Sequence, residues 1–202
     1  MSRNRALYVE TFVRADVDTV WGLTQNPSQH TRWDVRFSRI APAGDLADGG
    51  YRFDYERRLP GHTIRGTGTS IGEKIRSDGT RTSALKFTTT DRLSPLRSGQ
   101  GYWRYVPVDG GVRFITGYDY EPGFGPLVDR ALRPLVLWMT AWSFDRLRIW
   151  AETGTAPERW PSWSVLAVWR RDRPRASRCV IRAPGRDPMG HAPATLKGLP
   201  QP

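Results

Sequence analysis

Cysteine is almost absent from this sequence, since Cys179 is the single one among 202 residues. One cysteine cannot form an internal disulfide, and without a CxxC pair or a Cys/His companion it provides no zinc motif. Neither a disulfide framework nor a zinc site is therefore supported. The expected compartment is a reducing cytoplasm, where free thiols persist.

Long uncharged apolar runs are also missing. The most apolar stretch, residues 124–153, is interrupted by seven charged side chains. It therefore lacks the roughly eighteen uncharged residues that a bilayer span needs. Residues 1–12 carry two arginines and then an alternating pattern of residues that contains Glu10. They lack the apolar core of a signal peptide. We expect neither a transmembrane segment nor a secretion signal.

Familiar catalytic and cofactor motifs are missing as well. The sequence has no GxSxG, no HExxH and no P-loop. Residues 66–72 come near the dinucleotide fingerprint, but the third glycine is one place late and the stretch lies in an expected strand. The simpler interpretation is that glycines on one side of a strand allow a sharp bend where the long helix or a ligand comes close. No cofactor is predicted.

Candidate acids, bases and metal ligands are sparse. Of three histidines, His191 lies near the C-terminus, His30 lies on a short polar helix, and His62 begins a strand. Asp34 follows an expected helix end, and the other carboxylates alternate toward solvent, so we expect no paired acids. The residues predict no metal site and leave catalytic residues unassigned.

The material for a folded core is nevertheless ample. Hydrophobic residues make up 38% of the chain and include nine tryptophans. Residues 156–202 hold eight of the sixteen prolines and carry nine Lys/Arg against three Asp/Glu, giving +6 of the net charge of +11. This composition predicts a domain at 1–155 and a basic, largely disordered C-terminal segment at 156–202. Within it, residues 160–170 can form a short amphipathic helix.

The hydrophobic spacing predicts secondary structure along residues 1–155. A strand at 6–14 is followed by two short helices, which begin at the N-caps Asp16 and Asn26. Further strands are expected at 35–40, 51–58, 62–76, 80–91, 99–108 and 112–121. Asp109-Gly110 is typical of a tight hairpin turn. Apolar residues at three- and four-residue spacing then predict one helix over 124–153, bent at Pro134 and closed by Gly154.

These elements resemble the helix-grip layout of the START-like, or SRPBCC, superfamily. The resemblance rests on residues 15–34 (ADVDTVWGLTQNPSQHTRWD), on the hairpin sequence GGVRF at 110–114, and on the closing helix. It implies an α+β fold in which a curved antiparallel sheet of six to seven strands wraps around the long C-terminal helix. It also implies a cavity between them, in a superfamily of lipid carriers, ligand-binding receptors and polyketide aromatases/cyclases.

Strand alternation places aromatic and hydroxyl-bearing side chains on the covered face. The predicted ligand-binding residues are Phe53, Tyr55, Trp103, Tyr105, Phe114, Tyr118, Trp138 and Trp142. Two functions remain open: binding of a lipid-, steroid- or polyketide-like molecule, and aromatase/cyclase catalysis in the same cavity. Contact of the basic C-terminal segment with nucleic acid or a membrane surface is a third hypothesis, although no nucleic-acid motif is present. The oligomeric state is not indicated.

Overall fold

The computed structural model describes residues 6–47, 49–72 and 76–202. Its strands are β1 (Leu7–Val13), β2 (Arg39–Asp45), β3 (Gly50–Leu59), β4 (His62–Ile71), β5 (Arg81–Thr88), β6 (Leu96–Val108) and β7 (Gly111–Pro122). The α-helices are α1 (Val17–Gln25), α2 (Pro27–Trp33), α3 (Gly125–Thr153) and α4 (Thr195–Gly198). Short 3-10 helices are η1 (Pro157–Arg159), η2 (Ser162–Leu166), η3 (Ala176–Arg178) and η4 (Pro184–Arg186).

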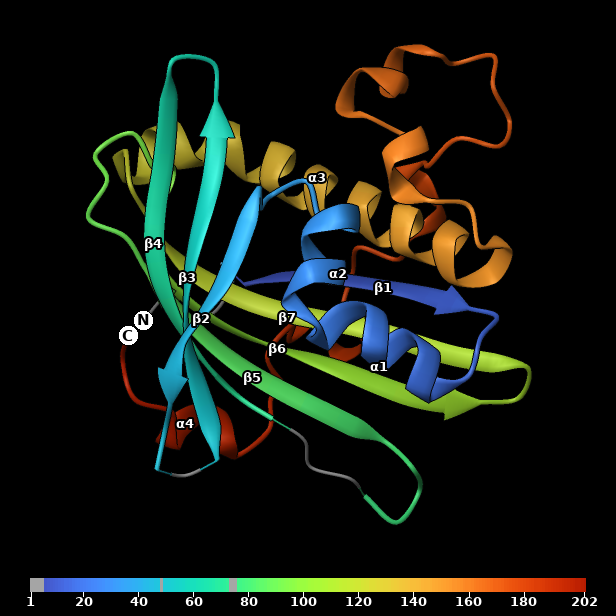
Figure 1. Ribbon diagram of the computed structural model, residues 1–202, viewed down its shortest axis with the longest axis horizontal. Coiled ribbons are helices and arrows are strands. Elements are labelled where there is room, and N and C mark those ends of the chain that lie inside the picture. Colours follow the sequence, from blue (N-terminus) through green and yellow to red (C-terminus); the bar gives the residue numbers. More distant parts are fainter. Residues whose placement is uncertain (1–5, 48, 73–75) are drawn as a thin grey trace.

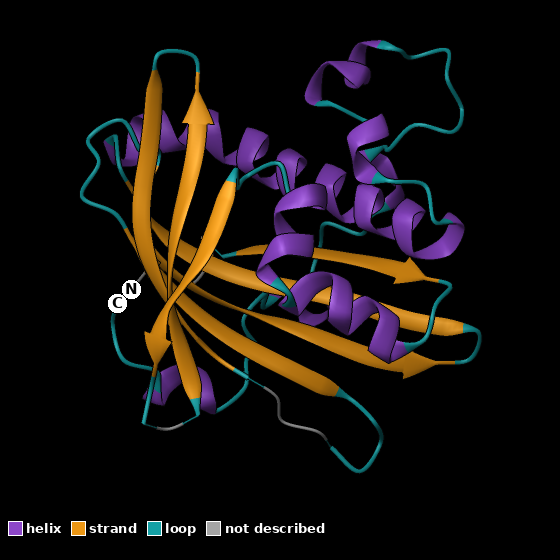
Figure 2. Ribbon diagram, in the orientation of Figure 1, coloured by secondary structure: helices purple, strands orange, loops and turns teal. Residues whose placement is uncertain are grey.

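The described strands form one antiparallel sheet of seven strands in the order β1-β7-β6-β5-β4-β3-β2. The sheet curves around α3, and α1 and α2 lie beside the same concave face (Figure 1). Figure 2 shows the division between the orange sheet and the purple helices. The predicted fold class, an α+β helix-grip with a curved sheet and a long C-terminal helix, is confirmed.

One strand is displaced from its predicted position. The expected strand at 35–40 begins instead at Arg39 and continues to Asp45 through residues that suggested a turn. Pro42 is tolerated because β2 is at the edge of the sheet, where a missing N–H need not bond a neighbour. The register shifts between Pro42 and Gly44, as a bulge does. The expected strand at 62–76 is described as far as Ile71, and residues 73–75 lie outside the described residues.

The helices begin and end for local reasons. Asp16 and Asn26 accept hydrogen bonds from backbone N–H groups at the starts of α1 and α2. Helix α3 continues through Pro134 and ends at Gly154, whose φ of +69° suits a residue without a Cβ. Gly110, at the β6–β7 turn, has φ of +76° for the same reason.

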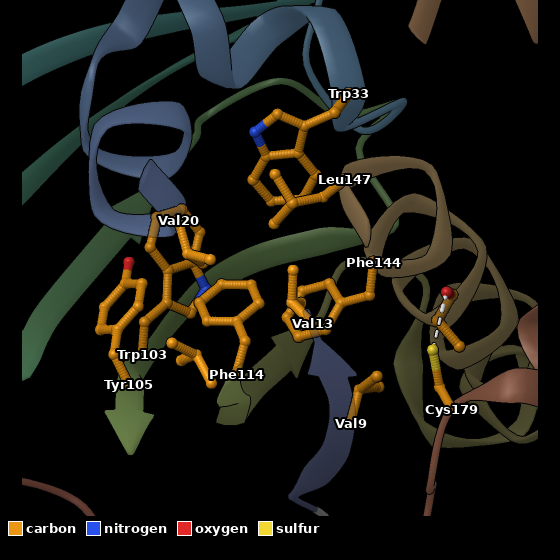
Figure 3. Close-up of a cluster of buried hydrophobic side chains, with 12 residues drawn as sticks. Val9, Val13, Val20, Trp33, Trp103, Tyr105, Phe114, Phe144, Leu147 and Cys179 are labelled. Atoms are coloured by element: carbon orange, nitrogen blue, oxygen red, sulfur yellow. Dashed lines mark hydrogen bonds between the residues drawn. The ribbon is translucent and has the colours of Figure 1, made fainter. Parts of the chain in front are cut away.

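A buried core lies where β1, β6 and β7 meet α1, α2 and the second half of α3. Figure 3 shows Val9, Val13 and Phe114 from the strands facing Phe144 and Leu147 from α3. The Phe114 and Phe144 rings stack with centroids 4.5 Å apart. These rings and valines fix the position of α3 over the sheet, because a close-packed interior leaves little room for sliding.

The C-terminal segment, residues 156–202, packs against the domain. Val180 exchanges two backbone hydrogen bonds of 2.8 Å with Glu10 of β1. Leu196 and Leu199 are buried, and Ala183, Met189 and Ala192 cover a cluster on the sheet. This differs from the largely disordered segment expected from composition. The reason is that some of its apolar residues, such as Met189 and Ala192, pack on the outer face of the sheet, while Cys179 joins the core cluster beside α3.

Candidate functional site

A cavity of about 460 Å³ lies between the concave face of the sheet, α2 and the first half of α3. Aromatic and aliphatic side chains from β3 to β6 form most of its wall, and Val136 and Met139 contribute from α3. Polar groups are few, among them Ser70, Ser83 and Arg36. Such a mostly apolar space with a few polar groups is typical of small-molecule sites.

The glycines of β4 make room for this wall. Phe53 pairs with Gly68 across the β3–β4 ladder, and Tyr55 pairs with Gly66. A Cβ atom at either glycine would collide with the facing aromatic ring. The glycine-rich stretch therefore lets the Phe53 and Tyr55 rings lie over the neighbouring strand, so these rings come close to the glycines where the sequence suggested the long helix or a ligand.

The eight predicted site residues separate into two groups. Phe53, Tyr55, Trp103 and Tyr118 line the cavity, whereas Tyr105, Phe114, Trp138 and Trp142 do not. Tyr105 and Phe114 are fully buried in the core cluster next to it. Their side chains follow the strand alternation that was predicted, but α1 and α2 cover that end of the sheet.

The rotation of α3 about its axis places its two tryptophans outside the cavity lining. Trp138 and Trp142 stack with ring centroids 6.1 Å apart, so they share one side of α3 as expected. Trp138 is 40% exposed, and Val136 and Met139 face the cavity instead. Trp142 is only 1% exposed, with the Arg146 guanidinium 5.1 Å from its ring. The prediction that both tryptophans point into the cavity side of the sheet is therefore wrong.

A buried ionic network stands at one side of the cavity. The Arg36 Nη2 donates to Asp34 Oδ2 at 2.6 Å and its Nε donates to Oδ1 at 2.9 Å. His30 Nε2 lies 3.1 Å from the same Oδ2. Arg36 Nη1 donates to Thr140 Oγ1 at 3.2 Å, which ties the turn after α2 to α3. His30 and Arg36 line the cavity, and Asp34 lies behind them.

Asp34 is an anion in this setting. Burial alone would raise the pKa of its carboxyl, but the Arg36 charge and the hydrogen bonds from His30 and Arg36 outweigh burial and hold that pKa well below its usual range. Burial likewise opposes the charge on Arg36, and the Asp34 carboxylate raises the Arg36 pKa above its ordinary value. The pair thus contributes no net charge to the cavity wall.

The tyrosine hydroxyls of the wall stay protonated. Burial raises the pKa of Tyr55 to about 12. Burial also raises the pKa of Tyr118, although the nearby Arg36 charge opposes the shift. Tyr118 Oη lies 3.0 Å from Thr140 Oγ1, so the hydroxyl is already held in one direction. Because Thr140 Oγ1 donates to Val136 O, the Tyr118 hydroxyl donates to Thr140. A ligand hydroxyl can donate to the Tyr118 oxygen, and a ligand carbonyl can accept the Tyr118 proton in place of Thr140.

Sequence reasoning missed three polar residues of this site. His30 had been placed on a short polar helix and Asp34 at a helix end, and Arg57 had been given no role. Asp34 is fully buried, which its place at a helix end did not indicate. The available signals were the four-residue spacing of His30 and Asp34 on one helix face and the even spacing of Arg57 with Phe53 and Tyr55.

The described parts of the chain hold neither a cluster of metal ligands nor a membrane-spanning helix. No three His, Cys, Asp or Glu side chains there come together as a metal site. No helix within residues 6–47, 49–72 and 76–202 is long and apolar enough to cross a membrane.

A curved antiparallel sheet that encloses an apolar cavity against a C-terminal helix defines the helix-grip class. Residues 5–149 match the family described as "Polyketide cyclase / dehydrase and lipid transport", and the chain belongs to it. The recognition of the START-like/SRPBCC superfamily from the sequence is thereby confirmed.

Two solved structures share the fold at low identity. A STAR-related lipid transfer protein from Xanthomonas axonopodis matches with TM-score 0.57 and 17% identity, covering 73% of this chain and 85% of that one. The ZhuI aromatase/cyclase from Streptomyces sp. R1128 matches with TM-score 0.52 and 11% identity, covering 75% and 98%.

A curated relative is much closer in sequence. An uncharacterized membrane protein, YndG, of Bacillus subtilis (strain 168) is 39% identical over 173 residues. The match covers 83% of this chain and 65% of the relative. The chain therefore spans about two thirds of the length of that protein.

Proposed function

We propose that this chain binds a hydrophobic or aromatic small molecule of lipid, steroid or polyketide type in the cavity under α3. The observation that carries the proposal is the cavity of about 460 Å³, which lies within the roughly 300–1,000 Å³ of typical ligand sites. The apolar wall favours the hydrocarbon part of a ligand, and the Tyr118 hydroxyl offers one oriented polar contact. The family description, which includes lipid transport, supports this choice.

Native mass spectrometry of the intact chain, purified from its own cells, tests the proposal. We expect a copurified small molecule in the wild-type protein, and its loss in Leu85→Trp, which adds bulk to the cavity wall. Val108→Trp is the matched control, because Val108 is exposed at the β6–β7 hairpin. Loss of the small molecule in both variants, or in neither, would place it outside this cavity.

A second candidate is aromatase/cyclase activity in the same cavity. It is favoured by His30, whose ring lines the cavity while its Nε2 contacts the buried Asp34 carboxylate at 3.1 Å. A base there could remove a proton from the carbon next to a ketone; attack of that carbon on a second ketone and loss of one water would close a ring. Tyr118 could donate to the ketone oxygen that becomes negative.

Incubation with a poly-β-ketone thioester, followed by mass spectrometry, tests this activity. We expect a product lighter by one water for each ring dehydrated, and a strong loss of rate in His30→Gln. His62→Gln is the control, since His62 pairs with Asp91 outside the cavity lining. An unchanged rate in His30→Gln would show that His30 is not the base.

A third candidate is contact of the C-terminal segment with an anionic membrane surface. Trp163, Leu166, Val168 and Trp169 are 64–78% exposed side by side in the sequence. Residues 157–175 contain five arginines and two acids, a formal charge of +3. Exposed aromatic and aliphatic groups beside arginines suit the headgroup region of acidic lipids. The name of the Bacillus relative as a membrane protein supports this candidate.

Cosedimentation with vesicles of phosphatidylglycerol or phosphatidylcholine tests the contact. We expect binding to the acidic vesicles, and its loss when Trp163 and Trp169 are both replaced by alanine. Phe12→Ala, an exposed aromatic residue of β1, is the control. Equal binding to both lipids would argue against a role for the arginines.

A further inference from the structure

One cationic side chain in the cavity wall is not neutralised. Arg57 lies on β3 in the same alternation as Phe53 and Tyr55, and like them it lines the cavity. Its side chain is half-buried. Burial lowers the pKa of the Arg57 guanidinium, and the more distant Asp34 charge opposes that shift. An arginine remains charged under such conditions.

The charge on Arg57 lacks a local counter-ion in the described parts of the chain. Among the residues that the structure describes, none forms an ion pair or a side-chain hydrogen bond with its guanidinium. No aspartate or glutamate is found among the described residues that line the cavity. Arg36 faces the same space, but Asp34 already neutralises it at 2.6 Å. The wall, as far as the described residues form it, thus carries one uncompensated positive charge.

The position of Arg57 gives the cavity a direction. It lies two residues from Leu59, which is 40% exposed near the tip of the β3–β4 hairpin. Tyr55 and Phe53 follow from Arg57 toward the interior, and both are largely buried. A molecule with one charged end and an apolar body could therefore place its charge at Arg57 and its body against these rings.

We propose that the cavity selects an anionic amphiphile, and that Arg57 binds its carboxylate or phosphate head group. A guanidinium presents paired N–H donors that fit such oxyanions. The apolar body of the ligand then lies along Tyr55, Phe53 and Phe87. This proposal rests on the proposed function, because it assumes that the cavity is the binding site.

A set of ten-carbon ligands tests the charge preference directly. The probes are decanoate, decyl phosphate, 1-decanol and decyltrimethylammonium, which share an apolar body and differ in head group. Binding to the full chain is followed by displacement of a fluorescent probe. We expect the two anions to bind at least about tenfold more tightly than 1-decanol, which is about 1.4 kcal/mol at 25 °C. The cation should bind most weakly.

Two arginine variants assign the preference to a residue. Arg57→Gln should bring decanoate and 1-decanol to similar affinity, while Arg57→Lys should keep most of the preference because the charge remains. Arg52→Gln is the matched control, since Arg52 is an exposed arginine on the opposite face of the same strand. The control should retain the wild-type order.

The outcomes separate this proposal from the one it rests on. If 1-decanol binds but the anions bind no better, Arg57 does not select charge and the cavity still binds apolar ligands. If the preference for anions survives in Arg57→Gln, another cation recognises the head group and the proposal is wrong. If none of the four ligands binds the wild-type chain, the proposed function fails with it.

Discussion

Asp34 and Arg36 form an ion pair of 2.6 Å inside the protein, with the Asp34 side chain completely shielded from solvent. The pair holds the turn between α2 and β2, and Arg36 extends it to Thr140 of α3. A buried ion pair of this kind contributes most to stability when both partners are present, because either charge alone is costly to bury.

Asp34→Asn should therefore destabilise the protein by about 3–5 kcal/mol, the range for breaking a buried pair. Urea unfolding followed by tryptophan fluorescence measures the loss. His30→Gln is the milder comparison, since it removes one hydrogen bond of the network and leaves the ion pair. A loss below about 1 kcal/mol for Asp34→Asn would mean that water reaches the pair.

The Asp34 carboxylate predicts that the free energy of unfolding depends on pH in the acid range. Its folded-state pKa is lowered, so its contribution to stability is fully present above the unfolded-state pKa of about 3.9. That contribution is lost as pH falls below this value, because the unfolded chain then binds a proton that the folded chain does not. The difference in unfolding free energy between wild type and Asp34→Asn should shrink from about pH 4 downward. A difference that stays constant between pH 6 and pH 3 would contradict the assignment.

The two tryptophans of α3 should differ sharply in their contribution to stability. Trp142→Ala removes a side chain that is 1% exposed and should cost about 3–5 kcal/mol. Trp138→Ala removes a 40% exposed ring and should cost less, since surface changes mostly stay near 0.5 kcal/mol. Chemical denaturation of both variants measures the difference. Equal losses would show that α3 is rotated from its position in the structure.

Truncation after Thr155 should leave a cooperative unfolding transition at a lower urea midpoint. The core cluster lies almost entirely within residues 1–155, so the shortened chain retains most of its packing. It loses the burial of Leu196 and Leu199 and the hydrogen bonds that Arg175 and Arg178 donate to buried Asp145. An unchanged midpoint would show that the C-terminal segment is not docked, and an unfolded product would show that it completes the core.

Tyr118→Phe should weaken ligands that carry a hydroxyl or carbonyl by about 0.5–1.5 kcal/mol and spare a hydrocarbon of the same shape. Tyr118 lines the cavity and its hydroxyl is held by Thr140. Tyr120→Phe is the matched control, because Tyr120 donates to Asp129 at 2.6 Å outside the cavity lining. Equal weakening of both ligand types, measured by displacement titration, would indicate packing and not a hydrogen bond.

Local patterns in the sequence determined the elements of the fold. Alternation along β3 predicted that Phe53 and Tyr55 share a covered face, and the spacing over 124–153 predicted α3. Those periods follow from backbone geometry alone, two residues in a strand and 3.6 in a helix. The end of α3 at Gly154 and the β6–β7 turn at Gly110 could be predicted from the sequence for the same local reason.

Tertiary structure decided what those patterns leave free. The apolar band of α3 is broad, so packing of Phe144 on Phe114, and not the spacing, set the rotation that turned Trp138 outward. The burial of Asp34 depends on its partner Arg36, which in turn contacts Thr140 of α3. Arg36 and Thr140 are over one hundred positions apart in the chain. The docking of residues 183–192 likewise depends on the outer face of the sheet, which exists only once β1, β6 and β7 have paired.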